Sequence, residues 1–497
     1  MIMLGYAWRG RRRTTVLDLP SDVLVVILVD VYLASGDAQS RSRPITKGDT
    51  DGEDVFTMYP SPEYLASVHS TWRRAMSSAS VFWTHLVVWI GADPTPLLRV
   101  REYLAWSCNR PLNIYVLRRS RSSGEDIDEG NRVGRVVQLI LPHMGRWRSL
   151  RIETLYSKSL PIPRIGLVGC APHLTELALS STMDDDLLVD TALPLTGDFE
   201  TPKLELLAMH GCVFRHAYVQ PFPRLQPPPK LITLSLSHHH QPHRPLTVVD
   251  LLLCLARCTR LRAVDFRDLE LDCIGDIDPI PRDIAAPLSL GVDCYNFTDM
   301  SGAVIAECSR LLSELQPEYL TLKRCTDPVP HGARLPLASA LSIEEVQDSA
   351  VLLSLLVALP GTPHDKTELV ACDGLTSSVL RDIAKPAVFD SGFLRQGTER
   401  REEWPLMYTS SLTITKCTQF RSSDVRALLR ARLMAQAASG NAGLMHQDFA
   451  VASIQYLCVT DCCELDLEDK EWLDHHVEVV QWDDWKGGRH FRRREAA

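Results

Sequence analysis

The stretch Leu231-Ile232-Thr233-Leu234-Ser235-Leu236 carries apolar side chains at its first, fourth and sixth positions. The last two are two residues apart, as in a strand that buries one of its faces. The same spacing recurs at Trp147/Leu150/Ile152, Leu174/Leu177/Leu179, Leu204/Leu207/Met209 and Leu261/Val264/Phe266, with successive first positions 27 or 30 residues apart. The sequence therefore contains a repeated unit with one short strand per copy.

Weaker copies of the pattern follow towards the C-terminus. They are Pro287/Leu290/Val292, Pro317/Leu320/Leu322, Leu341/Ile343, Leu412/Ile414, Ile454/Leu457/Val459 and Val477/Val480/Trp482. Helical patterns lie between several strands, over Val248–Leu255 and Val304–Leu315 and after Ser422-Ser423-Asp424. This rhythm resembles the leucine-rich repeat. A unit of this size cannot bury its apolar face alone, so the resemblance predicts an α/β fold, an irregular solenoid with parallel strands on one face and helices on the other.

Four of the fourteen cysteines fit the same register. Leucine-rich repeats place Asn or Cys eight positions after the first apolar residue, where the side chain turns inward as the chain leaves the strand. Cys212, Cys325, Cys417 and Cys462 each occupy this position. The match of Cys417 is the weakest, because its unit starts at Thr409 instead of an apolar residue. We expect these four side chains to point into the interior.

The segment before the repeats has a helical pattern. Pro20 suits the first position of a helix and Asp22 its first turn. Val23, Leu24, Ile27, Leu28 and Val31 follow at spacings that place them on one stripe, which we expect to be buried. A buried strand is the alternative, since Val25, Val26 and Val29 are β-branched. A second helix is predicted from Pro62, with Leu65, Val68, Trp72 and Met76 on one face. A third, short apolar element contains Val81, Phe82, Trp83 and Leu86, and a further helix is predicted from Leu97 to Ser107.

The order of motifs in this segment resembles the F-box. Leu19-Pro20-Ser21-Asp22-Val23-Leu24 matches its LP-x-E-[IL]-L start, Val68-His69-Ser70-Thr71-Trp72-Arg73 its V-C-[RK]-x-W-[RK] centre, and Phe82-Trp83 its final LW. Asp22 replaces the usual Glu and His69 the usual Cys, and the loop from Ser35 to Pro60 is longer than in compact F-boxes. Trp72 or Trp83 alone would be interpreted as a core residue. Taken together, the motifs are similar to those of the large fungal F-box families.

The resemblance implies a function without catalysis. A three-helix F-box docks on the adaptor of an SCF-type (cullin–RING) ubiquitin ligase, and the repeats behind it hold a protein substrate. Carried over by position, the adaptor-binding and helix-locking residues would be Leu19, Pro20, Leu24, Ile27, Leu28, Val68, Trp72, Arg73 and Trp83. Expected partners are the adaptor, the cullin reached through it and an unknown substrate protein. The alternatives are a non-ligase repeat scaffold with a degenerate F-box, and a hydrolase whose site is assembled only in space.

The expected organisation has four parts. Residues 14–90 form the F-box with a polar insert at about 35–60, residues 91–140 a helical connection, residues 141–485 the repeats, and residues 486–497 a basic tail. Arg11–Arg13 and Arg492–Arg494 are interpreted as solvated terminal charges. Asp184-Asp185-Asp186 is interpreted as a solvated turn.

No cofactor or metal site is expected. Zinc sites usually contain C-x₂₋₄-C pairs, and the chain has no CxxC; Cys254/Cys258 and Cys458/Cys462 are four apart without a matched second pair. His238-His239-His240 with His243 is interpreted as an exposed loop after a strand. The phosphate-binding, dinucleotide-binding, HExxH and GxSxG motifs do not occur.

The composition limits the other classes of function. The chain of 497 residues is 45% hydrophobic and 23% charged, which predicts a folded protein with a substantial core. A formal net charge of −9 argues against a nucleic-acid-binding protein, which needs clustered Lys and Arg. The longest apolar run, Val23 to Ala34, contains Asp30 and is too short to span a bilayer. Without a secretory leader, we expect reduced thiols and a location in the cytosol or nucleus.

Overall fold

The computed structural model describes residues 19–40, 62–118, 126–185, 197–219, 225–240, 246–273, 290–312, 317–336, 338–359, 366–390, 400–440 and 451–491. The chain divides into two units, unit 1 with Met1–Thr182 and Leu193–Pro202, and unit 2 with Met183–Ala192 and Lys203–Ala497. Residues 14–18 of the expected F-box, most of its insert and both arginine triplets lie outside the described residues.

Unit 1 begins with the predicted helix, α1 (Ser21–Ser40). The helical interpretation is confirmed over the strand alternative. The helix continues through Ser35–Ser40, which we expected to be a loop, since the single Gly36 costs only about 1 kcal/mol and does not end a helix. The expected buried stripe is only partly correct: Leu24 and Leu28 are buried, whereas Val23, Ile27 and Val31 are exposed.

The second predicted helix is divided in two. α3 (Pro62–Val68) and α4 (Ser70–Ser77) are separated at His69, whose backbone is extended and whose ring Nδ1 accepts a hydrogen bond from the Thr71 N–H at 3.1 Å. This side chain caps α4, because it satisfies one of the unpaired N–H groups of its first turn. The third element, η2 (Ser80–Trp83), is a single 3₁₀ turn. A three-helix F-box is therefore not evident from the described elements.

The parallel sheet of unit 1 starts earlier than expected. Its strand order is β1-β2-β3-β5, with β1 (His85–Ile90), β2 (Leu112–Arg118), β3 (Trp147–Tyr156) and β5 (Glu176–Met183). Between them lie α5 (Leu97–Trp106), α6 (Glu129–Ile140) and the 3₁₀ turns η3 (Leu141–Arg146) and η4 (Ser157–Ser159). β4 (Gly169–Cys170) pairs with β6 (Phe199–Glu200). The segment 91–140, expected only to connect, thus contributes β2 and α6 to the α/β layer.

Unit 2 has the strand order β7-β8-β10-β12-β13-β14-β15-β18-β19-β20-β21. The strands are β7 (Leu206–His210), β8 (Thr233–His239), β10 (Ala263–Leu269), β12 (Cys294–Thr298), β13 (Tyr319–Lys323), β14 (Ala340–Glu344), β15 (Lys366–Val370), β18 (Ser411–Thr415), β19 (Tyr456–Thr460), β20 (Val479–Trp482) and β21 (Trp485–Gly487). All neighbours pair in parallel except β20 with β21. Two small pairs, β9 (Leu246–Thr247) with β11 (Leu271–Asp272) and β16 (Ala387–Asp390) with β17 (Arg400–Glu403), lie apart from this sheet.

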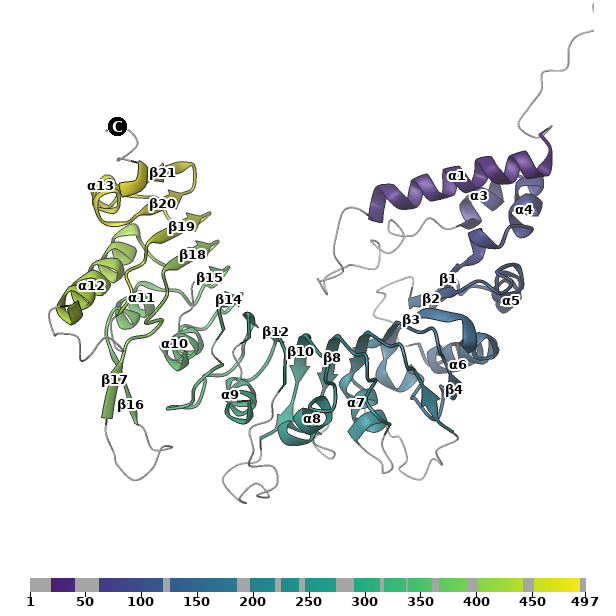
Figure 1. Cartoon of the computed structure of the whole chain (residues 1–497), viewed down its shortest axis with the longest axis horizontal. Coiled ribbons are helices and arrows are strands. Elements are labelled where there is room, and N and C mark those ends of the chain that lie inside the picture. The colour runs from purple at the N-terminus through teal and green to yellow at the C-terminus, as the bar shows by residue number, and fades with distance from the viewer. Residues whose placement is uncertain are drawn as a thin grey trace, which may run out of the picture. The chain divides into compact units, whose positions relative to one another are not determined.

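The helices of unit 2 lie on one side of its strands (Figure 1). They are α7 (Gly211–Phe214), continued by the π-helical η5 (Arg215–Val219), α8 (Val248–Leu255), α9 (Gly302–Leu311), α10 (Ser349–Ala358), α11 (Ser377–Ile383), α12 (Ser422–Gly440) and α13 (Leu467–His476). Thr247, Ser301, Asp348 and Thr376 cap four of them through side-chain oxygens. The fold is thus mixed α/β, with a large, mostly parallel sheet.

In the large sheet, the eight strands β8, β10, β12, β13, β14, β15, β18 and β19 end in the same turn. Two residues after the last inward apolar side chain of each strand stands a residue with positive φ, and none of these residues is a glycine: His238, Asp268, Asp299, Arg324, Glu345, Ala371, Lys416 and Asp461. The next residue turns its side chain inward. In three places the N–H of this next residue donates to the equivalent sulfur of a neighbouring unit: Leu269 to Met300 at 3.4 Å, Cys372 to Cys417 at 3.3 Å and Cys417 to Cys462 at 3.4 Å. We call these contacts the sulfur ladder.

The predicted cysteine positions are confirmed. Cys212, Cys325 and Cys417 are buried and Cys462 is half-buried. Cys372 occupies the equivalent position after β15, a strand that the sequence pattern did not reveal. The fourteen cysteines all lie in described parts of the chain and are free thiols. Within the described residues, no helix combines the length and the apolar character that a membrane crossing requires.

Candidate functional site

One face of α1 packs into unit 1. Leu24, Leu28 and Tyr32 are spaced by four residues, so they share one stripe of the helix, and all three are buried. The ring of Tyr32 meets Phe82 of η2 edge-on, with 5.5 Å between ring centroids. These contacts hold α1 against α4 and η2. The other side chains of residues 21–34 are half-buried or exposed.

The opposite face of α1 exposes apolar side chains. They are Val23, Val26, Ile27, Val31 and Leu33, with exposed fractions between 40% and 61%. At 100° per residue they cover about 160° of the helix, with Asp30 near the middle of the arc. We call these five residues the apolar face of α1. On α3, Tyr64 and Val68 are also exposed. Exposed apolar side chains gathered on one face of a helix in this way are typical of a site that binds another protein.

Trp83 is part of the core that supports α1 and α4. It is 2% exposed and its indole N–H donates to the carbonyl oxygen of Met76 at 2.9 Å. Its ring stacks on Tyr103 and contacts Trp106, both with centroids 4.7 Å away. Trp83 therefore locks elements together, and its side chain offers no surface to a partner.

The residues that the sequence predicted to bind an adaptor divide into three groups. Leu24, Leu28 and Trp83 are buried, Leu19 and Trp72 are half-buried, and Pro20, Ile27, Val68 and Arg73 are exposed. The buried three can only act by holding the helices in place. Sequence reasoning missed Val26, Leu33 and Tyr64, and it assigned Val23 and Val31 to the buried stripe. The available signal was that every position from Val23 to Leu33 except Asp30 is apolar, whereas a helix on a small module buries only one side.

The helices leave one face of the strands of unit 2 uncovered (Figure 1), and polar and charged side chains pair on this face and at the ends of its strands. Arg324 donates from Nε and Nη2 to the two carboxylate oxygens of Asp299, each at 2.7 Å, and from Nη1 to Glu345 at 3.0 Å. Lys323 lies 3.0 Å from the same Glu345. Ser235 donates to Asp265 on the next strand at 3.0 Å. These fixed polar groups, on the parallel strands and in the turns that follow them, are suited to recognising a polar protein surface.

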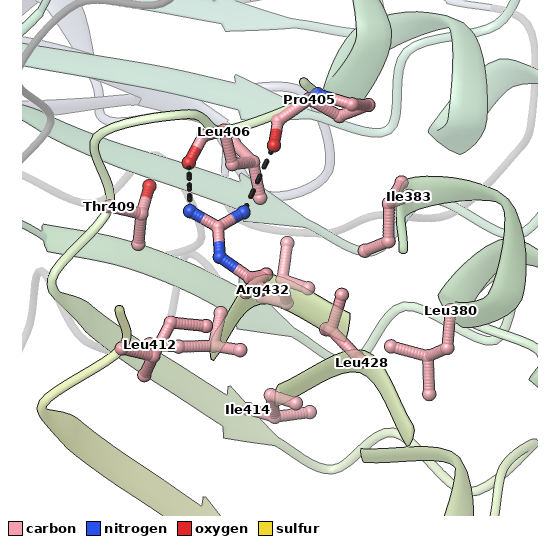
Figure 2. Close-up of a pocket in the computed structure, with 11 residues that line it drawn as sticks. Leu380, Ile383, Pro405, Leu406, Thr409, Leu412, Ile414, Leu428 and Arg432 are labelled. Carbon is pink, nitrogen blue, oxygen red and sulfur yellow. Dashed lines mark hydrogen bonds between the residues drawn. The ribbon is translucent and has the colours of Figure 1, made fainter. Parts of the chain in front are cut away.

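The interior of unit 2 next to α12 contains a void of about 10 Å³, lined by residues that include Leu428 and Arg432 (Figure 2). It has room for about one water molecule. An open hollow of about 490 Å³ is lined by Arg430, Leu433, Met434, Ala437, Trp472 and His476. Neither lining combines a nucleophilic side chain with a carboxylate or imidazole base, so neither is a candidate active site.

Comparison with protein-family models found no match to this chain, and comparison with curated proteins found none. The features of the molecule that bear on its function are the apolar face of α1, the uncovered strand face of unit 2 and the motifs of the sequence.

Proposed function

We propose that this protein is the substrate-recognition subunit of an SCF-type ubiquitin ligase. In this proposal the N-terminal helices bind the adaptor, and through it the cullin, while the strand face of unit 2 binds a substrate protein. The finer fold follows: an F-box-like segment in unit 1 and an irregular leucine-rich-repeat solenoid behind it. The chain itself performs no chemistry and acts by raising the concentration of substrate near the ligase.

The observation that carries this proposal is the apolar face of α1. A globular helix with apolar side chains on every side is normally buried on all sides, but among residues 21–34 of α1 only Leu24, Leu28 and Tyr32 are fully buried. Complete burial of an aliphatic side chain contributes about 1.5–3 kcal/mol. For five side chains that are about half exposed, covering by a partner would contribute roughly 4–7 kcal/mol before the cost of association. We infer that this partner is the adaptor, because the F-box-like motifs lie in the segment that forms α1, α3, α4 and η2.

The repeating turn supports the second half of the proposal. From β8 to β19, neighbouring strands of the large sheet pair in a constant register, so equivalent side chains of successive units lie side by side. Substitutions on the uncovered strand face change the presented chemistry without changing the inward apolar positions. A substrate receptor needs this separation between a constant scaffold and a variable surface.

The test is co-purification of the full chain with the SCF adaptor. We expect the exposed-face variant Ile27→Asp/Val31→Asp to lose at least tenfold in adaptor affinity, because two charges would have to be buried at the interface. Both side chains are exposed in the free protein, so the variant should fold. The matched control is Met434→Asp on α12, which places a charge at an apolar side chain that is 65% exposed in unit 2.

Three outcomes are informative. Loss in the α1 variant with normal binding by the control supports the proposal. Normal adaptor binding by the α1 variant contradicts the assigned surface. No binding by the parent chain at micromolar adaptor contradicts the ligase function and favours the repeat scaffold that recruits no ligase.

A further inference from the structure

A cluster of histidine and aspartate side chains lies where strands β8 and β10 end. His238 and Asp268 are the positive-φ residues of two successive turns, and the pairing of His239 with Leu269 brings them level. We expected these histidines to form an exposed loop. That expectation is wrong for His238 and His239, which belong to β8, and His239 is fully buried. His243 lies outside the described residues. The positive φ of His238 interrupts the alternation of the strand, and the side chains of His238 and His240 both contact Asp268.

Three ligand-type atoms converge in this cluster. His238 Nδ1 lies 2.8 Å and His240 Nε2 lies 2.9 Å from the same oxygen, Oδ2 of Asp268. The other ring nitrogen of His240, Nδ1, lies 3.2 Å from Oε1 of Glu270. The side chains of His238, His240 and Asp268 are about one-third exposed, so they combine a fixed backbone with access to solvent.

Both nitrogens of His240 therefore face carboxylate oxygens. A neutral imidazole carries one proton, so one of the two contacts would set a lone pair against an anionic oxygen. Two arrangements remove this conflict: a doubly protonated ring, or a cation bound at Nε2 with the proton kept on Nδ1. In the second arrangement Glu270 accepts a hydrogen bond from a metal-bound histidine, which is the common outer-shell partner of such ligands.

We propose that His238, His240 and Asp268 bind a zinc ion, with Glu270 orienting His240. Zinc takes imidazole nitrogen and carboxylate oxygen at about 2.0–2.2 Å, which places tetrahedral ligand atoms about 3.3 Å apart. The present separations of 2.8 and 2.9 Å need to widen by about half an ångström, which exposed side chains can do by small rotations. Three protein ligands leave the fourth position for water or for a side chain of a bound protein.

A second trio lies behind this site and has a different role. The Sγ–H of Cys212 donates to Asp184 at 3.5 Å, and His210 Nδ1 accepts the Cys212 N–H at 3.4 Å, so these three residues contact one another. Asp184 also accepts the His240 N–H at 2.7 Å and thereby fixes the backbone of a proposed ligand. Its side chain is 8% exposed. The expectation of a solvated turn is therefore wrong for Asp184, which is held by these internal contacts.

The test is isothermal titration of the full chain, freed of any affinity tag, with zinc chloride. We expect one site per chain and a loss of about 100-fold or more in affinity for Asp268→Asn, which keeps the shape of the side chain but weakens the ligand. Glu270→Gln should cost about tenfold, as expected for an outer-shell partner. Cys212→Ser, which changes none of the proposed ligands, should bind zinc as the parent does.

Unfolding temperatures measured without zinc show whether each variant is folded, so that a misfolded protein is not mistaken for a lost ligand. Saturable one-to-one binding that depends on Asp268 supports the site. Lack of saturable binding by the parent chain, undiminished binding by Asp268→Asn, or loss of binding in Cys212→Ser would each overturn it. The inference does not depend on the proposed ligase function, and a negative adaptor assay leaves it intact.

Discussion

Replacing Arg432 by methionine should loosen the C-terminal part of unit 2. The side chain is 2% exposed, and its guanidinium donates to the carbonyl oxygens of Pro405, Leu406, Met407 and Ala452 at 2.7 to 3.3 Å. Figure 2 shows the bonds to Pro405 and Leu406. Burial lowers the pKa of Arg432 to about 10, so the group is still a cation at neutral pH. The Arg432 side chain thus connects α12 to two other segments of the chain, one at Pro405–Met407 and one at Ala452.

The expected loss can be worked out acceptor by acceptor. The carbonyls of Leu406 and Met407 keep a second donor, from the N–H groups of Thr409 and Ala452. Those of Pro405 and Ala452 lose the donor that the guanidinium supplied. An unsatisfied buried acceptor costs about 1–3 kcal/mol, so two of them cost roughly 2–4 kcal/mol when partial compensation is allowed. Lysine keeps the charge but has fewer donors, so Arg432→Lys should lie between the parent and Arg432→Met.

Amide hydrogen exchange measures this loss locally, which matters because a chain with two units has no single unfolding free energy. A loss of roughly 2–4 kcal/mol corresponds to a fall of about 30- to 700-fold in protection of the α12 and β18 amides. The matched control is Arg430→Met, on the same helix but exposed. Equal protection in the two variants, or greater protection in Arg432→Met than in the parent, would refute the reasoning.

Three further predictions concern stability. Leu28→Ala should cost unit 1 about 2–5 kcal/mol, because the side chain is 1% exposed, and calorimetry should show an earlier transition for that unit. Gly302→Ala should lower the melting temperature, since a Cβ there would come within 2.4 Å of the Asp327 carbonyl oxygen; Gly134→Ala, where no atom lies within 4 Å, should raise it slightly. Burial lowers the pKa of His210 to about 3, so only the unfolded chain takes up a proton between pH 6.5 and 3. Unit 2 should therefore lose stability as the pH falls below about 6.5, and melting curves at pH 7.5 and 5 should show a smaller loss for His210→Gln.

The strands of unit 2 were predictable because inward residues alternate with polar ones. The failures have specific causes. β15 has Thr367 at an inward position, where its hydroxyl pairs with Thr409 at 3.0 Å, so the apolar template missed it. Near β12 the pair Leu290/Val292 has the right spacing but precedes the strand, whose inward residues are Tyr295 and Phe297.

The candidate sites were less predictable. From Val23 to Ala34 every position of α1 except Asp30 is apolar, so periodicity alone could not show that the buried side chains of this stretch are Leu24, Leu28 and Tyr32. The cluster around Asp268 joins residues about 30 positions apart, and its geometry depends on strand register, which a single sequence does not specify. For the same reason Asp184 could not be placed beside His240.

The sulfur ladder also has a consequence for how this chain can change in length. Its donors and acceptors are 31 residues apart at Leu269 and Met300 but 45 apart at Cys372, Cys417 and Cys462, yet the contact is the same. The additional residues form α11, the β16–β17 hairpin and the long α12, all away from the ladder. Residues can therefore be inserted or removed on the helix side of the sheet, in evolution or by design, while the pairing of the strands stays the same.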